Sequence, residues 1–119
     1  MVIRGKRVEK PLPHLEYALI PPDWKVCEGS FISGYGIDRY ASGQSCDEHF
    51  HDCEEYWFIL EGQALARCGD EVEEVGAGDA VYTPMGTSHQ ITAITDISVL
   101  WLYGELKGRK RFGHLHDGD

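Results

Sequence analysis

The sequence predicts an all-β fold, built as a sandwich or a small barrel. From residue 29 onward, short runs rich in β-branched and aromatic residues alternate with clusters of glycine and other turn-forming residues. The chain has 119 residues, of which 14 are glycine, and no stretch shows a sustained helical periodicity. Many short strands at regular spacing in a chain of this length are typical of a sandwich or barrel around a single core.

Several runs are predicted strands, because they are rich in valine, isoleucine, threonine and aromatic residues. These runs are residues 31–40, 55–62, 63–69, 79–84, 89–94 and 97–106. The segments between them favour turns, for example CGDE at residues 68–71 and VGAGD at residues 75–79. The sequence therefore predicts short strands joined by tight connections.

The two ends of the chain differ from this pattern. Residues 1–28 contain four of the five prolines, and proline cannot donate to the hydrogen-bond ladder of a central strand. We expect this segment to be an irregular arm or an edge strand that lies over the barrel or crosses to a second subunit. Residues 29–106 are then expected to form the barrel, and residues 107–119 a polar tail, within a single domain.

The charge and hydropathy of the chain exclude several kinds of partner. The formal net charge is −9, from 11 Lys+Arg against 20 Asp+Glu, which argues against binding to nucleic acid. No apolar run approaches the roughly 20 residues that span a bilayer, so no membrane partner is expected. The N-terminus lacks the apolar stretch of a secretory signal, which predicts a cytoplasmic protein with reduced cysteines.

The stretch CDEHFHDCEE, residues 46–55, contains two histidines, two cysteines and five carboxylates. Histidine, thiolate and carboxylate are the usual protein ligands of transition metals. One interpretation is a closed zinc site made by Cys46, His49, His51 and Cys53. Along an extended strand these residues would spread over roughly 20 Å, which is too far for one tetrahedron. A tight turn could rescue Cys53, but Cys46 would remain remote.

A second interpretation uses no cysteine. His49 and His51 lie two residues apart, so they point to the same face of an extended strand. Glu55 follows a turn and begins the next predicted strand, and His89 comes from a separate strand after the turn TPMGTS. Together these residues predict an open His/carboxylate metal site with room for a substrate.

The spacing of these residues resembles the two conserved motifs of the cupin superfamily. The first motif, G-x5-H-x-H-x3-E-x6-G, is matched by Gly43, His49, His51, Glu55 and Gly62. The second, G-x5-P-x-G-x2-H-x3-N, is matched by Gly78, Pro84, Gly86 and His89. Ala93 stands where the family often has the asparagine of this second motif.

The resemblance implies a small single-domain cupin, with the fold of a double-stranded β-helix or jelly-roll barrel. It also implies a metal inside one end of the barrel, held by His49, His51, Glu55 and His89. At Ala93 it implies a pocket that is slightly larger and less polar than in other members. The family's asparagine is not a metal ligand, so this departure leaves the expected metal site intact.

The expected ligand set indicates a catalytic site and not a closed structural one. Three imidazoles and one carboxylate leave open positions on an ion that prefers six ligands. The cofactor is predicted to be one divalent transition metal, Mn, Fe, Co, Ni or Zn, and the donor set does not choose among them. The resemblance implies a metal-dependent enzyme of small molecules. An isomerase or epimerase, or a lyase, acting on a small polar substrate (sugar-like or a carboxylate) is favoured. A cupin dioxygenase and a non-catalytic, ligand-sensing metal-binding barrel are the alternatives.

Alternation along the predicted strands gives candidate substrate contacts. These candidates are Tyr35, Arg39, Trp57, Tyr82 and Trp101. Arg39 has two interpretations, an inward anchor for a substrate carboxylate or phosphate, or a partner in a surface ion pair.

Two further pairs of residues have open roles. His114 and His116 repeat the H-x-H spacing, and either fold over the mouth of the barrel or lie in solvent. Cys46 and Cys53 are expected beside the ligands or at the rim of the site. The proline-rich arm and the apolar run at residues 97–106 favour a homodimer.

Overall fold

The computed structural model describes residues 1–9, 14–24 and 29–119 of the chain. All the regular elements in these residues are strands, which agrees with the predicted all-β class. The strands are β1 (Leu15–Leu19), β2 (Gly34–Tyr40), β3 (Glu55–Glu61), β4 (Gln63–Cys68), β5 (Glu71–Gly76), β6 (Ala80–Thr83), β7 (His89–Ala93) and β8 (Ile97–Tyr103). No helix in the described ranges is long and apolar enough to cross a membrane.

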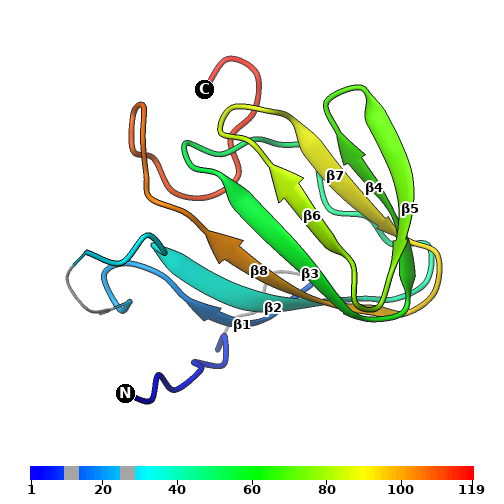
Figure 1. Cartoon of the computed structure of the whole chain (residues 1–119), viewed down its shortest axis with the longest axis horizontal. Helices are drawn as coiled ribbons and strands as arrows, with labels where there is room; N and C mark the ends of the chain where they lie inside the picture. The colour runs from blue at the N-terminus through cyan, green and yellow to red at the C-terminus, as the bar shows by residue number, and fades with distance from the viewer. Residues whose placement is uncertain (10–13, 25–28) are drawn as a thin grey trace.

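The strands form two antiparallel sheets that face each other (Figure 1). The larger sheet has the order β1-β2-β8-β3-β6, and the smaller one has the order β5-β4-β7. This arrangement is a small jelly-roll barrel, as the sequence predicts. The pairing of β3 with β8 places Glu55 opposite Tyr103 and Trp57 opposite Trp101, so residues of both strands face one interior.

The alternation of side chains along β3 and β8 follows the sequence prediction. Glu55, Trp57 and Ile59 are buried on β3, whereas the residues between them are exposed. On β8, Trp101 and Tyr103 are likewise buried. Their aromatic rings pack at a centroid distance of 4.7 Å and form part of the core between the sheets. The interior of the barrel is therefore largely apolar next to the buried carboxylate.

The prediction missed one strand, β5, in the sequence EVEEVG. Its glutamates have low β-propensity, and most of its residues are exposed, so neither composition nor alternation marks it as a strand. The strand forms because the preceding turn folds it back on β4, with pairs from Cys68↔Glu71 to Gln63↔Gly76. Tertiary pairing overrides the local preference here.

The segment that carries His49 and His51 is not a regular strand, in contrast to the expectation. It makes isolated bridges to different partners: Ser45 pairs with Thr92, His49 with His89, and Phe50 with Leu115. The segment changes partner within a few residues, which prevents a continuous ladder. It nevertheless stays extended enough for His49 and His51 both to be buried.

A glycine fixes the connection that follows β3. Gly62 has a φ of 84°, which favours glycine, and a Cβ at this position would overlap the carbonyl oxygen of Asp96. This close approach explains why a motif glycine stands at the end of the strand that begins with Glu55.

Segments near both ends of the chain pair with the barrel. β1 is an edge strand that pairs with β2, with Leu19 opposite Tyr35. Residues 10–13 and 25–28 of the expected arm lie outside the described residues. At the other end, Arg111 holds Asp52 through its backbone N–H and its guanidinium, and Leu115 exchanges backbone hydrogen bonds with Phe50. The polar tail therefore crosses the end of the barrel where the two histidines lie (Figure 1).

Candidate metal centre

The structure gathers the four residues expected as ligands into one buried cluster: His49, His51, Glu55 and His89. One potential ligand atom of each lies within 4.8 Å of the others. The Nε2 atoms of His51 and His89 each lie 3.2 Å from Oε1 of Glu55. All four residues are at most 4% exposed, so water does not screen this cluster.

The outer nitrogen of each imidazole faces a backbone carbonyl. Nδ1 of His49 lies 2.6 Å from the oxygen of Asp47, Nδ1 of His51 lies 2.9 Å from that of Gly113, and Nδ1 of His89 lies 2.9 Å from that of Thr87. A carbonyl can only accept, so each Nδ1 carries the proton and each Nε2 presents a lone pair. Backbone carbonyls fix metal-binding histidines in this tautomer.

The inner polar atoms of the cluster lack hydrogen-bond partners. Nε2 of His51, Nε2 of His89 and Oε1 of Glu55 are buried and have no hydrogen-bond partner. Lone pairs and a carboxylate that face one another without a proton between them repel, and buried polar atoms are normally paired. A cation at their centre would satisfy all of them. The residues therefore fit a divalent metal.

The ionisation of the cluster also suits a cation. Burial raises the pKa of Glu55, but positive charge at the adjacent His51 and His89 outweighs burial and lowers the pKa to about 2. A cation held among their Nε2 atoms would act in the same direction. Burial, together with the neighbouring His114, lowers the pKa of His49 to about 3. At neutral pH, Glu55 is therefore a carboxylate and His49 is a neutral imidazole, which are the forms that bind a metal.

The loop before β7 positions His89. Thr87 donates its backbone N–H to the oxygen of Pro84, which closes a tight turn, and Gly86 donates to the oxygen of His51. The second hydrogen bond ties this turn to the segment that carries the first two ligands. The second motif thus supplies a ligand and also the contact that holds it beside the first motif.

The two cysteines nearest the ligands stay outside the cluster. In the described part of the chain, neither thiol belongs to a group of three or more residues that could hold a metal. Cys46 and Cys53 are both buried and free, and burial raises the pKa of Cys46 to about 11 and that of Cys53 to about 12. The closed zinc site that Cys46 and Cys53 would complete has no support in this geometry.

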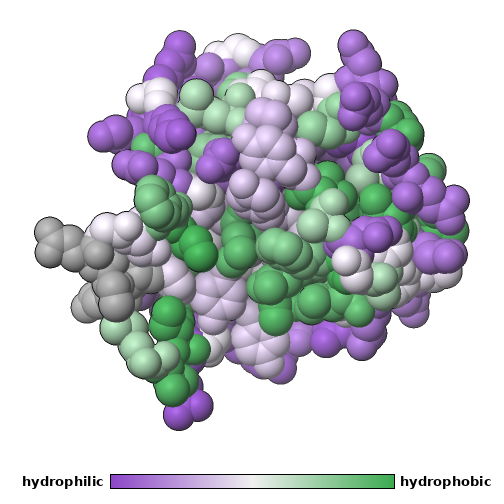
Figure 2. All heavy atoms as spheres, viewed as in Figure 1, coloured by the Kyte–Doolittle hydropathy of each residue, from purple (hydrophilic) through white to green (hydrophobic). Residues whose placement is uncertain are grey.

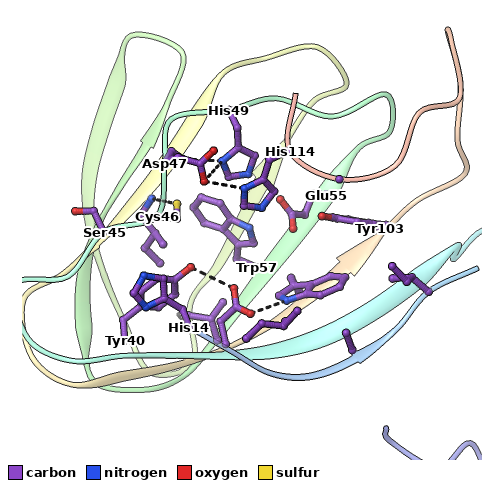
Figure 3. A pocket seen from close by; sticks show the side chains of 18 of the residues that line it. His14, Tyr40, Ser45, Cys46, Asp47, His49, Glu55, Trp57, Tyr103 and His114 are labelled. Carbon is purple, nitrogen blue, oxygen red and sulfur yellow. Dashed lines mark hydrogen bonds and ion pairs between the residues drawn. The ribbon is translucent and has the colours of Figure 1, made fainter. Parts of the chain in front are cut away.

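A cavity of about 550 Å³ opens from the cluster into the barrel. His49 and Glu55 line one end of it, and Figure 3 shows Trp57 between this end and the opposite wall. Most of the wall is apolar and aromatic, and includes Trp57, Ile91, Val99, Trp101, Tyr103 and Phe112. Its volume lies within the range of pockets that bind small molecules. Ala93 is buried in the core beside Ala64 and is not part of this lining.

Two of the expected substrate contacts, Trp57 and Trp101, line this cavity. The structure does not bring the other three there. Tyr82 is exposed on β6 and donates its hydroxyl to Glu54, because Thr83 is the residue of β6 that turns inward. Tyr35 packs edge-on against Trp24.

The third of these residues, Arg39, makes a surface contact. Its Nε pairs with the carboxylate of Glu16, and its Nη1 donates to Oγ of Ser98 at 2.8 Å. The reason is the phase of β2, meaning which of its alternate residues face inward. Asp38 and Tyr40 line the cavity, whereas the residues next to them point outward. Of the two interpretations of Arg39, the geometry matches the surface ion pair.

Sequence reasoning did not single out several other residues of the lining: Asp38, Tyr40, His14 and Asp47. Tyr103 also lines the cavity, and alternation along its strand does predict that it faces inward with Trp101. Alternation offered a signal for Asp38 and Tyr40, since they have the opposite parity to Arg39, but it could not choose the phase of β2. His14 reaches the cavity only because its segment folds back along β2.

The tail closes over the end of the cavity where the histidine cluster lies. The ring of His114 stacks on His49 at a centroid distance of 3.6 Å and an angle of 6°, and its Nδ1 lies 2.7 Å from Oδ1 of Asp47. His116 contacts the other oxygen of Asp47 through Nε2. Figure 3 shows His114 and Asp47 beside His49. His114 therefore folds over the mouth of the barrel, as one of its two interpretations expected.

Comparisons with known proteins identify the family of the chain. A family model described as "Cupin domain" matches residues 36–103, which is more than half of the chain. An uncharacterized protein of Sinorhizobium fredii is 40% identical over 78 residues, which cover 65% of this chain and only 36% of that protein. The chain thus spans little more than a third of the length of this curated relative.

Solved structures show the same barrel. A Cupin 2 conserved barrel domain protein from Salinispora arenicola is 25% identical, with a TM-score of 0.62 over 76% of each chain. A predicted oxalate decarboxylase from Thermotoga maritima is 26% identical, with a TM-score of 0.60 over 64% of this chain and 69% of that one. Both motifs, the jelly-roll barrel and the match to the family model show that the chain belongs to the cupin family.

Proposed function

We propose that this cupin is a metal-dependent enzyme that acts on a small carboxylate substrate, with lyase chemistry such as decarboxylation. One observation carries the proposal. A buried cluster lies at the end of a cavity of about 550 Å³, and some of its Nε2 and carboxylate atoms have no hydrogen-bond partner. The cluster consists of His49, His51, Glu55 and His89. A site that only stabilised the fold would need no such cavity.

A divalent transition metal held by these four residues would supply a Lewis acid that binds substrate oxygens and draws charge from them. The chain itself contributes the surroundings. Trp57, Trp101 and Tyr103 give the cavity an apolar wall, which lowers the local dielectric constant and strengthens electrostatic interactions there. The carbonyls of Asp47, Gly113 and Thr87 keep the ligand rings in one orientation.

The lining favours a carboxylate over a phosphorylated sugar. No lysine or arginine is among the described residues that line the cavity, and Arg39, the expected anchor, faces outward to Glu16. A phosphate would therefore have no cationic side chain to bind. A carboxylate carries one negative charge, which a bound metal alone can balance, whereas a phosphate carries up to two. The relative from Thermotoga maritima, titled a predicted oxalate decarboxylase, is consistent with this choice.

A dioxygenase is the second candidate, because aromatic side chains form much of the wall. Trp57, Trp101 and Phe112 could pack against an aromatic or other apolar substrate body. An isomerase or epimerase differs from both candidates in its products, since it consumes no oxygen and releases no carbon dioxide.

The test is an assay of the metal-loaded protein with small mono- and dicarboxylates and with aromatic hydroxy acids. Carbon dioxide release without oxygen uptake supports the lyase, and oxygen uptake supports the dioxygenase. Glu55→Gln should abolish either activity, whereas Glu54→Gln, at the neighbouring carboxylate that bonds Tyr82, should not. Turnover that survives in Glu55→Gln would contradict the proposal.

The assembly and location of the protein also remain proposals. We propose a homodimer that forms through the outer face of the larger sheet. Hydrophobic side chains gather there over β3, β6 and β8 (Figure 2), and Tyr56, Phe58, Leu60 and Tyr82 are 36–48% exposed. Light scattering would test the dimer, with Phe58→Lys expected to give monomers. A cytoplasmic location and the absence of nucleic-acid and membrane partners stay predictions from the sequence.

A further inference from the structure

A second group of polar side chains lies in the wall of the cavity away from the metal cluster. Asp38 accepts a hydrogen bond from Nε1 of Trp101 at 3.1 Å and another from the hydroxyl of Tyr40 at 3.2 Å. The ring of His14 stacks on Tyr40 at a centroid distance of 4.4 Å. Figure 3 shows Tyr40 and His14 across the cavity from His49. We call Asp38, Tyr40 and His14 the distal polar cluster.

This cluster has hydrogen-bonding capacity that the protein does not use. A carboxylate can accept about four hydrogen bonds, and Asp38 accepts one on each oxygen. Nδ1 of His14 is buried and has no partner among the described residues. Buried polar groups are normally paired, so groups without a partner on the wall of a largely apolar cavity suggest a ligand.

The electrostatics of Asp38 point the same way. Burial raises the pKa of Asp38 to about 6, although the hydrogen bonds from Trp101 and Tyr40 act against this rise. A neutral amide in place of Asp38 could hydrogen-bond the Trp101 indole and the Tyr40 hydroxyl without the cost of burying a carboxyl group. The presence of a carboxyl group at this position is explained if a ligand brings a hydrogen-bond donor to it.

We propose that the distal polar cluster binds the end of the substrate that lies away from the metal, and selects substrates that carry an amine or hydroxyl donor there. The inference rests on the proposed function, because it takes the carboxylate of the substrate to lie at the metal cluster. The substrate class is then a small molecule with a carboxylate at one end, a hydrogen-bond donor at the other, and an apolar body between them. Trp57, Val99 and Trp101 line the space that this body would occupy.

The test compares benzoate with 4-(aminomethyl)benzoate, which adds an ammonium donor on one methylene group at the end away from the carboxylate. Calorimetry on the metal-loaded protein should show that the amine probe binds about tenfold more tightly, as expected for a hydrogen bond to a charged group. Asp38→Asn should bring the two affinities within about twofold of each other and leave benzoate binding unchanged. Asp70→Asn, at an exposed aspartate in the turn between β4 and β5, should keep the full preference.

A second variant keeps the test decisive if Asp38→Asn does not fold. His14→Phe retains an aromatic ring to stack on Tyr40 but removes the buried nitrogen, and should weaken the amine probe selectively. Binding of both probes by the wild-type protein with equal affinity would overturn the inference alone. No binding of either probe, or benzoate binding that is unchanged in His49→Ala, would instead contradict the proposed function, so the two failures are distinguishable.

Discussion

The main chains of His49 and His89 exchange two hydrogen bonds, from N of His49 to O of His89 at 3.1 Å and from N of His89 to O of His49 at 2.8 Å. Their imidazole rings lie 4.5 Å apart between centroids. This bridge joins the two motifs at the ligands themselves, so the geometry of the site does not depend on flexible side chains alone. A metal site at this bridge would therefore be largely formed before an ion binds.

The first prediction concerns metal content. Protein purified without a tag should contain about one transition-metal ion per chain, because four buried donors converge on one point. His49→Ala and His89→Ala should each lose most of this metal while keeping the fold. Elemental analysis, with circular dichroism to check the fold, measures both.

Cysteine variants are the matched control for this prediction. Cys46→Ser and Cys53→Ser should retain the metal, because neither thiol joins the cluster. Loss of metal in the cysteine variants, with retention in His89→Ala, would instead revive the closed zinc site.

The second prediction concerns stability without the metal. Removal of the ion leaves Glu55 charged and buried, with Nε2 of His51 and His89 unpaired. A ligand at a hundred times its Kd stabilises a protein by about 2.7 kcal/mol, so a chelator should lower Tm by about 10 °C. Differential scanning calorimetry measures the shift.

His49→Ala provides the comparison for the chelator experiment. This variant should show little change in Tm on chelation, since it has already lost one donor of the cluster. A wild-type Tm that does not respond to the chelator would rule out a bound metal as a source of stability.

The parts of the site that depend on motif spacing and on alternation along a strand could be predicted from the sequence. The spacing of the motifs selects His49, His51, Glu55 and His89, and the structure gathers these four. Trp57 was within reach because it lies two residues from Glu55 on the same strand, and side chains alternate along a strand. Local periodicity therefore carried this part of the site.

Other parts depended on contacts that local sequence does not encode. The phase of β2 follows from its register with β8, which places Asp38 opposite Val99 and Gly36 opposite Trp101. The position of His114 follows from the tail, which pairs with Phe50 from the far end of the chain. Both features are long-range, and so is the hairpin that makes β5 a strand in spite of its glutamates.

The third prediction tests the close approach of β2 to the aromatic wall. A Cβ added at Gly36 would overlap the Trp101 ring, whose Nε1 bonds Asp38. Gly36→Ala should therefore displace the indole and destabilise the protein by about 1–3 kcal/mol, as overpacked cores do. Urea denaturation followed by tryptophan fluorescence measures the loss.

Gly5→Ala serves as the control for Gly36→Ala. A Cβ at Gly5 would meet its nearest neighbour, the hydroxyl of Tyr35, at an ordinary 3.5 Å. This variant should change the free energy of unfolding by no more than about 0.5 kcal/mol. Equal effects of the two substitutions would show that Trp101 does not depend on the missing side chain of Gly36.

The last prediction concerns pH and the closure of the tail. The hydrogen bond to Asp47 raises the pKa of His116 above its ordinary value of 6.5. The protonated imidazole therefore adds stability that is fully present below pH 6.5 and is lost as the pH rises through the folded pKa. Burial opposes ionisation of Asp47, but His116 and His114 hold its pKa at about 2, so its contribution is present above pH 3.8 and is lost only as the pH falls towards 2. The contact should thus be strongest between about pH 4 and pH 6.5.

Proton NMR of the His116 ring measures this directly. In the wild-type protein its resonances should titrate with a midpoint above 6.5, and in Asp47→Asn the midpoint should fall back towards that value. Asp117→Asn, at an exposed aspartate next to His116 in the sequence, should leave the midpoint raised. A His116 midpoint that is the same in the wild type and in Asp47→Asn would mean that the tail does not hold Asp47 in solution. The stacking of His114 over His49 would then need another anchor, since Asp47 is the residue that both tail histidines contact.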